Sequence, residues 1–229
     1  MEPILQRLKQ EERDLLMRYS EPVTFRKHAN IFEEKNPANY LYFIAKGIIQ
    51  VFKTVGPNRH LTVFTRGEND GIGEIGVFGG GSYSHTAQAM EGSELYALER
   101  GTAEKLLSEN GGLSLHFLRW LAESLDASKA KLRDYIAFGS EGAVASFFVR
   151  YANMYGVVTP DGIRMTEPLV IQDISKHIAI SRETVSRIVN KWKKQGVIGN
   201  DGKYFLLKDM TYFKRLLACD QCGVENCVL

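Results

Sequence analysis

The chain has 229 residues, of which 44% are hydrophobic and 24% charged, and its formal net charge is only +2. These values fit a soluble globular protein with room for one large domain or two modest ones, and they exclude a globally basic protein, so any attraction to nucleic acid must be local. No apolar run approaches the roughly 18 residues of a membrane span, and the first residues do not resemble a signal peptide, so we expect a cytoplasmic protein with no membrane partner.

The first half of the chain has the pattern of a small β domain. A short amphipathic helix is expected over residues 3–19, and short β-rich runs separated by Gly, Asn and Pro follow from residue 23 to about residue 98. Frequent turn signals between short strands predict a sandwich or roll of about eight strands. Gly56-Pro57-Asn58 separates two of these runs and predicts a hairpin that links Val51 to Val63.

A long helix is predicted from about Leu113 to Phe138. Its apolar stripe has a spacing of three to four residues and consists of Leu113, Phe117, Trp120 or Leu121, Ser124 or Leu125, Ser128, Leu132 and Ile136. A narrow seam on a helix of this length favours pairing with a second copy in a parallel coiled coil. The alternative is an ordinary core helix. Residues 139–168 are expected to hold another helix, from Gly142 to Tyr155, and a loop at 159–162.

Residues 169–198 have the pattern of a helix-turn-helix. Apolar residues repeat at helical spacing on both sides of Ala179-Ile180-Ser181, and Ser181 is well placed to cap the second helix at its N-terminus. Asn200-Asp201-Gly202-Lys203 follows and predicts a hairpin between two apolar runs. The two features together predict a winged helix-turn-helix, whose second helix enters the major groove.

The second helix carries the chemistry of base readout. Arg182, Glu183, Ser186 and Arg187 are spaced so that several share one outward face. Arginine can pair bidentately with guanine, and glutamate can accept from the cytosine amino group. Contacts to phosphate suit the residues that follow, namely Lys191, Lys193 and Lys194 with Trp192 among them. The alternative is an ordinary solvated helix face, but residues 182–194 hold five lysines and arginines against one glutamate.

All three cysteines lie in the last eleven residues, as Cys219, Cys222 and Cys227. The spacing C-x2-C-x4-C lets several thiolates converge on one centre, as in iron–sulfur or zinc sites, but a fourth ligand has to come from elsewhere. A zinc site with a histidine such as His177, a redox disulfide between Cys219 and Cys222, and an unligated tail are the alternatives. A thiol oxidoreductase is disfavoured because the cysteine pair does not lie in a βαβ unit, so we do not expect an enzyme.

The recognition-helix residues from Ser181 to Arg187, continued through Gly196-Val197-Ile198, resemble the signature of the CRP/FNR transcription regulators. The resemblance runs over nearly the whole chain and implies an operator that is a palindromic duplex. It assigns Arg182, Glu183 and Arg187 to a TGTGA-like half-site, whereas Ser186 stands at the position used by the TTGAT-reading branch.

The segment from Gly73 to Phe78 resembles the part of the family's cupin-like sensor roll that cradles cyclic nucleotide in the cAMP-binding branch. There an Arg-Ser pair follows and holds the cyclic phosphate. Here residues 81–86 read Gly-Ser-Tyr-Ser-His-Thr, without the arginine. A bound phosphate would lose its bidentate partner, so we do not expect cyclic-nucleotide binding.

The cysteine tail resembles that of the Gram-positive type of FNR, which binds a 4Fe–4S cluster at its C-terminus. In that type an aspartate at the end of the dimer helix is the fourth ligand, and the resemblance assigns this role to Asp134. It therefore implies one 4Fe–4S cluster per subunit, held by Cys219, Cys222, Cys227 and Asp134. Asp126 and Asp220 are possible substitutes.

The predicted fold is α+β. It comprises a cupin-like β-roll over residues 1–110, a dimerisation helix over 111–138, a winged helix-turn-helix over 139–210 and a cysteine tail over 211–229. The predicted function is a homodimeric, oxygen-sensing transcription regulator that binds double-stranded DNA and works with RNA polymerase. The alternative is the same DNA-binding scaffold, switched by a cysteine disulfide or by a small ligand in the β-roll.

Overall fold

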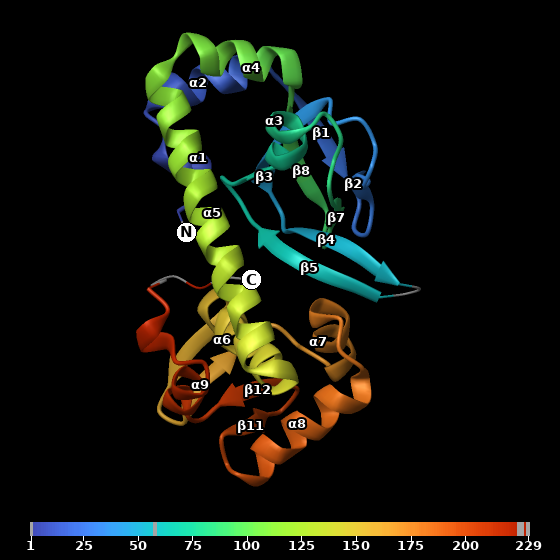
Figure 1. The fold of residues 1–229 in the computed structure, drawn as a ribbon, viewed down its shortest axis with the longest axis vertical. Helices are drawn as coiled ribbons and strands as arrows, with labels where there is room; N and C mark the ends of the chain where they lie inside the picture. Colours follow the sequence, from blue (N-terminus) through green and yellow to red (C-terminus); the bar gives the residue numbers. More distant parts are fainter. Residues whose placement is uncertain (1, 57–58, 224–226, 228–229) are drawn as a thin grey trace. The chain divides into compact units, whose positions relative to one another are not determined.

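The computed structural model describes residues 2–56, 59–223 and 227, which form two compact units (Figure 1). The first unit spans residues 1–54 and 62–124, and the second spans residues 55–61 and 125–229. One long helix, α5 (Gly111–Ala137), contributes residues to both units. No helix within the described ranges combines the length and the apolar character that crossing a bilayer requires.

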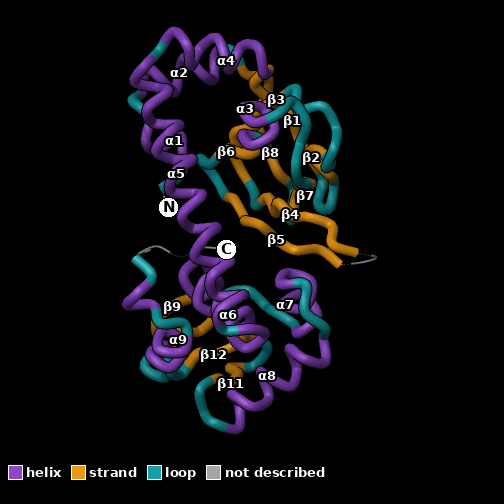
Figure 2. Tube along the Cα trace, in the orientation of Figure 1, coloured by secondary structure: helices purple, strands orange, loops and turns teal. Residues whose placement is uncertain are grey.

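Two four-stranded sheets build the first unit, which confirms the predicted β-roll (Figure 2). The strand order is β1-β8-β3-β6 in one sheet and β2-β7-β4-β5 in the other. Alternation along β8 explains the packing, because Leu95 and Ala97 are buried whereas Glu94 is exposed. The strands are β1 (Ser20–Phe25), β2 (Asn30–Phe32), β3 (Tyr40–Lys46), β4 (Ile49–Gly56), β5 (Arg59–Arg66), β6 (Gly71–Ile72), β7 (Thr86–Ala89) and β8 (Ser93–Glu99).

The hairpin predicted between Val51 and Val63 agrees with the sheet, since β4 and β5 are neighbours in it. The middle of its turn, residues 57–58, lies outside the described residues. Two further helices belong to this unit, α3 (Glu74–Gly79) and α4 (Arg100–Glu109).

The single helix predicted over residues 3–19 is wrong in its continuity. The chain forms α1 (Ile4–Arg7) and α2 (Gln10–Arg18), with extended backbone at Leu8 and Lys9 between them. The carboxylate of Glu12 accepts a hydrogen bond of 3.0 Å from the backbone N–H of Lys9. This bond satisfies a donor at the start of α2, so a new helix begins there.

The second unit combines helices with a four-stranded sheet in the order β11-β12-β10-β9. Its core is aromatic, with the rings of Trp192 and Phe213 5.0 Å apart and those of Phe148 and Phe205 5.3 Å apart. The elements after α5 are α6 (Gly139–Tyr155), β9 (Gly156–Thr159), β10 (Gly162–Met165), α7 (Ile171–Ile178), α8 (Arg182–Lys194), β11 (Ile198–Asp201), β12 (Tyr204–Leu207), α9 (Met210–Leu216) and the 3₁₀ turn Cys219–Gln221.

The loop predicted at residues 159–162 is the turn of a hairpin between β9 and β10. The prediction missed these strands because each has only four residues, too few for a clear alternation. By contrast, the hairpin predicted at Asn200–Lys203 is confirmed, since β11 and β12 pair across it.

The predicted stripe of α5 is wrong in part, because it mixes two faces of the helix. Leu113, Phe117 and Trp120 are at most 2% exposed and belong to the core of the β-roll. A different set of apolar side chains is exposed on α5, namely Leu115, Leu118, Leu125, Leu132 and Ile136. The sequence could not separate the two sets, because a helix that packs against its own domain has apolar residues on more than one side.

Candidate functional site

The recognition helix α8 begins where the sequence predicted. The Ser181 side chain accepts a hydrogen bond of 3.3 Å from the backbone N–H of Thr184, which confirms Ser181 as the N-cap. Ala179 adopts a left-handed backbone conformation with φ of 56° and ends α7. The hydroxyl of Ser175 donates to the carbonyl of Ile180 at 2.7 Å. These local contacts fix the turn between the two helices.

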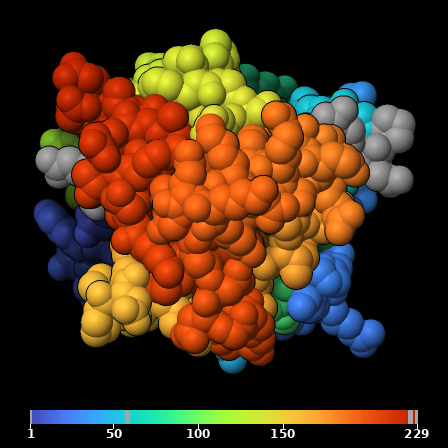
Figure 3. Space-filling model, turned by 90° about the horizontal axis from the view of Figure 1, so that it is seen from below, coloured from blue at the N-terminus to red at the C-terminus, as the bar shows by residue number. Residues whose placement is uncertain are grey.

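One face of α8 is buried and the opposite face is open. Val185, Ile188, Val189 and Trp192 are buried in the core of the second unit. Arg182, Glu183 and Arg187 are exposed and Ser186 is half-buried, so the residues predicted to read bases share the open side. Figure 3 shows the orange segment that contains α7 and α8 lying open on the surface seen from below. Contacts of these residues to bases stay a prediction.

The basic end of α8 differs in part from the prediction. Trp192, which we expected beside the phosphate contacts, is fully buried, and its indole N–H donates to Glu141 of α6 at 3.2 Å. Glu141 also accepts hydrogen bonds from Lys191 Nζ at 2.8 and 3.1 Å, one to each carboxylate oxygen. The ammonium of Lys193 lies 5.3 Å from the ring centre of Phe205, and Lys194 is exposed.

Asp134 lies at the C-terminal end of α5 and is only 4% exposed. Its Oδ1 accepts a hydrogen bond of 2.9 Å from Arg133 Nη2. Its Oδ2 accepts one of 2.7 Å from the Ser146 hydroxyl and lies 3.6 Å from Arg150 Nη2. Two cations from α5 and α6 therefore compensate the charge of this buried carboxylate.

The cysteines of the tail lie in the same neighbourhood as Asp134. Cys219 and Cys222 share one 3₁₀ turn, in which the Cys222 N–H donates to the Cys219 carbonyl at 3.1 Å. The carbonyl of Cys227 accepts a hydrogen bond of 2.6 Å from the Asn153 side chain of α6. The side chains of all three cysteines are half-buried.

Electrostatic interactions connect these groups. Burial raises the pKa of Cys219, and the negative charge of Asp134 and the other two thiols raises it further. Burial also raises the pKa of Cys227, with Arg150 acting in the opposite direction and Cys222 and Asp134 adding to the increase. Asp134 of α5 therefore lies near Cys219 and Cys227 of the tail, and joint ligation by these residues stays a prediction. In the part of the chain that the structure describes, however, no three Cys, His, Asp or Glu side chains lie at metal-ligand spacing.

Thiolates are the usual ligands of iron–sulfur clusters, so the chemistry of the three cysteines is compatible with such a cluster. The candidates for a fourth ligand differ in their surroundings. Asp126 is largely exposed and pairs with Lys129 at 3.6 Å, and Asp220 is exposed and accepts from Gln221. His177, the candidate fourth zinc ligand, lies in the core of the second unit with its ring 5.0 Å from that of Phe147. Asp134 alone among these four combines burial with an electrostatic effect on the thiols.

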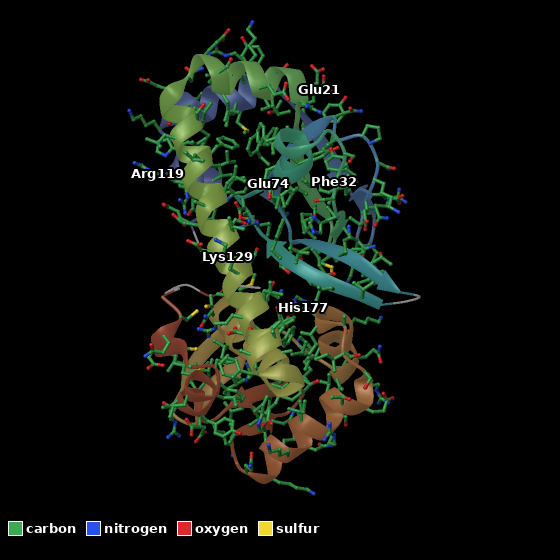
Figure 4. The ribbon with its side chains drawn as sticks, in the orientation of Figure 1. Glu21, Phe32, Glu74, Arg119, Lys129 and His177 are labelled. Carbon is green, nitrogen blue, oxygen red and sulfur yellow. The ribbon has the colours of Figure 1, made fainter. Side chains whose placement is uncertain are left out.

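A small pocket lies in the β-roll beside Glu74, and Phe32 and Glu74 both line it (Figure 4). The rings of Phe32 and Tyr83 stack at 3.9 Å between their centres, and the Tyr83 hydroxyl donates to the carbonyl of Tyr40 at 2.7 Å. Burial raises the pKa of Glu74 to about 7, partly opposed by Arg66. The ammonium of Lys53 donates to the Ser84 carbonyl at 3.0 Å and pairs with Glu34, so it is already neutralised.

Comparisons with known proteins define the class. Residues 22–110 match the cyclic nucleotide-binding domain family, and residues 142–216 match the Crp-like helix-turn-helix domain family. Together with the fold, these matches describe a DNA-binding transcription regulator. The chain belongs to the CRP/FNR family of such regulators.

Individual relatives agree with this assignment. The anaerobic regulatory protein of Bacillus subtilis is 33% identical over 93% of this chain and 91% of its own length. The CRP-like cAMP-activated global transcriptional regulator of Mycobacterium tuberculosis is 25% identical over 85% of this chain and 87% of its own. The structure of a CooA mutant from Carboxydothermus hydrogenoformans has the same fold, with a TM-score of 0.78, 20% identity and coverage of 94% of this chain and 96% of that one.

Proposed function

We propose that the protein is a homodimeric regulator that senses oxygen through one 4Fe–4S cluster per subunit and binds a TGTGA-like inverted repeat. The observation that carries the proposal is the buried carboxylate of Asp134, which Arg133 links to the start of the cysteine tail through hydrogen bonds of 2.9 Å to Asp134 and 2.6 Å to the Leu217 carbonyl. The Bacillus relative is named an anaerobic regulatory protein, which supports oxygen as the signal.

Cys219, Cys222, Cys227 and Asp134 would hold the cluster, which supplies an oxygen-sensitive redox centre. Three of these residues follow α9 of the DNA-binding unit, whereas Asp134 belongs to the long helix α5. Joint ligation would tie the tail to α5 and so favour one arrangement of the recognition helices over another. When the tie breaks, that preference is lost and the affinity for DNA falls.

The exposed side of α5 supports a dimer. Exposed positions repeat there in alternating steps of three and four, and all of them except Lys129 are apolar: Leu115, Leu118, Ala122, Leu125, Lys129, Leu132 and Ile136. This is the a/d pattern of a two-stranded coiled coil, and Lys129, which Figure 4 labels on α5, is a polar residue at one a position. A parallel pair of α5 helices would present two copies of α8 to successive major grooves of a palindromic operator. RNA polymerase is the further partner that such a regulator requires.

In each half-site Arg182, Glu183 and Arg187 would read the bases of TGTGA from the open side of α8. Arginine side chains suit the guanines, and the Glu183 carboxylate suits a cytosine amino group on the opposite strand. Ser186 lies on the same helix, at the position that the TTGAT-reading branch of the family uses. A TTGAT-like repeat is therefore the comparison duplex.

The experiment compares DNA affinity under nitrogen and after air exposure, with the TGTGA repeat, with a TTGAT-like repeat and with a duplex whose half-sites are scrambled. We expect tight binding to the TGTGA repeat only, and only under nitrogen. Asp134→Asn should bind weakly under both conditions, whereas Asp126→Asn, which changes an exposed carboxylate of the same helix, should behave as the wild type. Cys222→Ser provides a second variant that leaves the Asp134 hydrogen bonds intact.

Equal affinity of all samples, with and without air, would contradict the proposal. If the affinity of iron-free, air-exposed protein were restored by a thiol reductant, the switch would instead be a disulfide between Cys219 and Cys222.

A further inference from the structure

The two carboxylate oxygens of Asp134 face different surroundings. Oδ2 is held from α6 by the hydroxyl of Ser146 at 2.7 Å and by Arg150 at 3.6 Å. The Arg150 Nε also donates to the Ser146 hydroxyl at 3.1 Å, and the side chain of Arg150 is only 2% exposed. Oδ1 is held by Arg133, whose side chain is 30% exposed. One oxygen therefore belongs to a buried network and the other to a partner that water can reach.

Arg133 also holds the start of the cysteine tail. Its Nη2 donates to the backbone carbonyl of Leu217 at 2.6 Å as well as to Asp134 Oδ1. Leu217 is buried and precedes Cys219 by two residues. Arg133 is thus hydrogen-bonded both to Asp134 and to the start of the tail.

We propose that Asp134 exchanges Arg133 for the cluster, while Ser146 and Arg150 keep their hold on the other oxygen in both states. The inference rests on the proposed function. A carboxylate that binds a metal through one oxygen keeps the second for hydrogen bonds, and such partners orient the ligand. The side chain of Arg150 is 2% exposed and is also bonded to Ser146, whereas that of Arg133 is 30% exposed and can turn its guanidinium to water.

Arg133 then competes with the cluster for Asp134 Oδ1, and in the cluster-free chain it holds Leu217 of the tail against α5. Without the Arg133 side chain, Asp134 Oδ1 loses the partner that competes with the cluster, and the carbonyl of Leu217 loses the donor that Arg133 supplies. The ligated state should therefore persist longer in air, and the cluster-free protein should be less stable to heat. If Arg133 only stabilised the fold, its removal would lower the thermal stability without slowing the loss of the cluster in air.

The test compares wild type, Arg133→Gln, Arg133→Lys and Arg119→Gln, the last being an exposed arginine of the same helix. Iron and sulfide are assayed after anaerobic purification, and the decay of the visible absorption is followed at a fixed oxygen concentration. We expect full iron content in all four proteins. Decay should be about tenfold slower in Arg133→Gln, the scale on which partners around metal ligands act. Arg133→Lys and Arg119→Gln should decay at the wild-type rate, and air-treated Arg133→Gln should melt below Arg119→Gln.

Decay of Arg133→Gln at the wild-type rate would overturn the inference and leave the proposed function standing. Low iron in Arg133→Gln, restored in Arg133→Lys, would also overturn it, because Arg133 would then assist ligation. A wild type without iron and sulfide would contradict the proposed function itself, and the exchange with it. Circular dichroism of each variant checks that the fold is intact before the comparison is made.

Discussion

Glu141 on α6 binds the ammonium of Lys191 on the recognition helix, with Nζ to oxygen distances of 2.8 and 3.1 Å. The same carboxylate accepts the indole N–H of Trp192 at 3.2 Å. It therefore fixes α8 to α6 and neutralises one of the lysines predicted to contact phosphate. A phosphate contact of Lys191 would therefore have to replace this internal carboxylate.

Replacing this carboxylate should strengthen the electrostatic part of DNA binding. Glu141→Gln keeps an oxygen for the Trp192 indole but frees Lys191 for a phosphate, so the slope of log affinity against log salt concentration should become steeper by about 1. The slope is measured on a scrambled duplex between low and moderate salt. Glu109→Gln, which removes an exposed carboxylate from α4, is the control and should leave the slope close to that of the wild type. A slope unchanged by Glu141→Gln would show that Lys191 makes no phosphate contact.

Arg187 should contribute to sequence discrimination more than to general affinity. Its side chain lies on the open face of α8, so Arg187→Ala should weaken binding to the TGTGA repeat by about 1–3 kcal/mol and relax the preference at one guanine. Binding titrations on the repeat and on single-base variants measure both effects. Equal weakening on specific and random duplexes would make Arg187 a phosphate contact instead.

Leu132 should be necessary for dimerisation but not for folding. It is 58% exposed at a d position of the α5 seam, so Leu132→Glu would place two carboxylates in the interface of the proposed dimer. The expected cost is on the order of 2 kcal/mol or more, which should shift sedimentation toward the monomer at micromolar concentration. Val158→Glu, at an apolar side chain that is 82% exposed on β9, should remain dimeric. A dimeric Leu132→Glu protein would move the interface away from this seam.

Glu74 should make the stability of the β-roll depend on pH. Burial raises its pKa from the ordinary value of 4.5 to about 7, so the folded state binds a proton more tightly than the unfolded state. This contribution to stability is complete below pH 4.5 and is lost as the pH rises through about 7. The variant Glu74→Gln has no carboxyl group that titrates at this position. Its free energy of unfolding, relative to that of the wild type, should therefore rise by up to about 3 kcal/mol between pH 4.5 and pH 8.

Urea unfolding at both pH values measures this difference, with Glu94→Gln, an exposed residue of β8, as the control. The same pH dependence in wild type and Glu74→Gln would show that Glu74 does not titrate in this way.

The sequence contained enough local information to locate the DNA-binding unit. Ser181 has the side chain that a helix N-cap needs, and Asp201-Gly202 has the backbone preference of a tight hairpin, so both were predictable from neighbouring residues alone. Asp134 could not be found in this way, because it is distinguished by its contacts to Ser146 and Arg150 and by its proximity to Cys219, and all three residues lie farther along the chain. Only the resemblance to FNR singled it out among the carboxylates of α5.

The α5 stripe shows a second reason why sequence reasoning was incomplete. Phe117 and Leu118 are adjacent, but Phe117 is buried in the β-roll whereas Leu118 is 64% exposed. Periodicity identifies the apolar positions of a helix but not the partner of each one. Which side of α5 packs against the β-roll depends on the folded domain, and the spacing of residues along the helix does not contain it.

The most direct test of an oxygen-sensing cluster is the absorption spectrum of anaerobically purified protein, with iron and acid-labile sulfide assayed on the same sample. We predict a brown protein with about four irons per chain, whose visible absorption bleaches in air together with its affinity for the TGTGA repeat. A colourless, iron-free protein that binds the repeat equally well under nitrogen and in air would contradict the account.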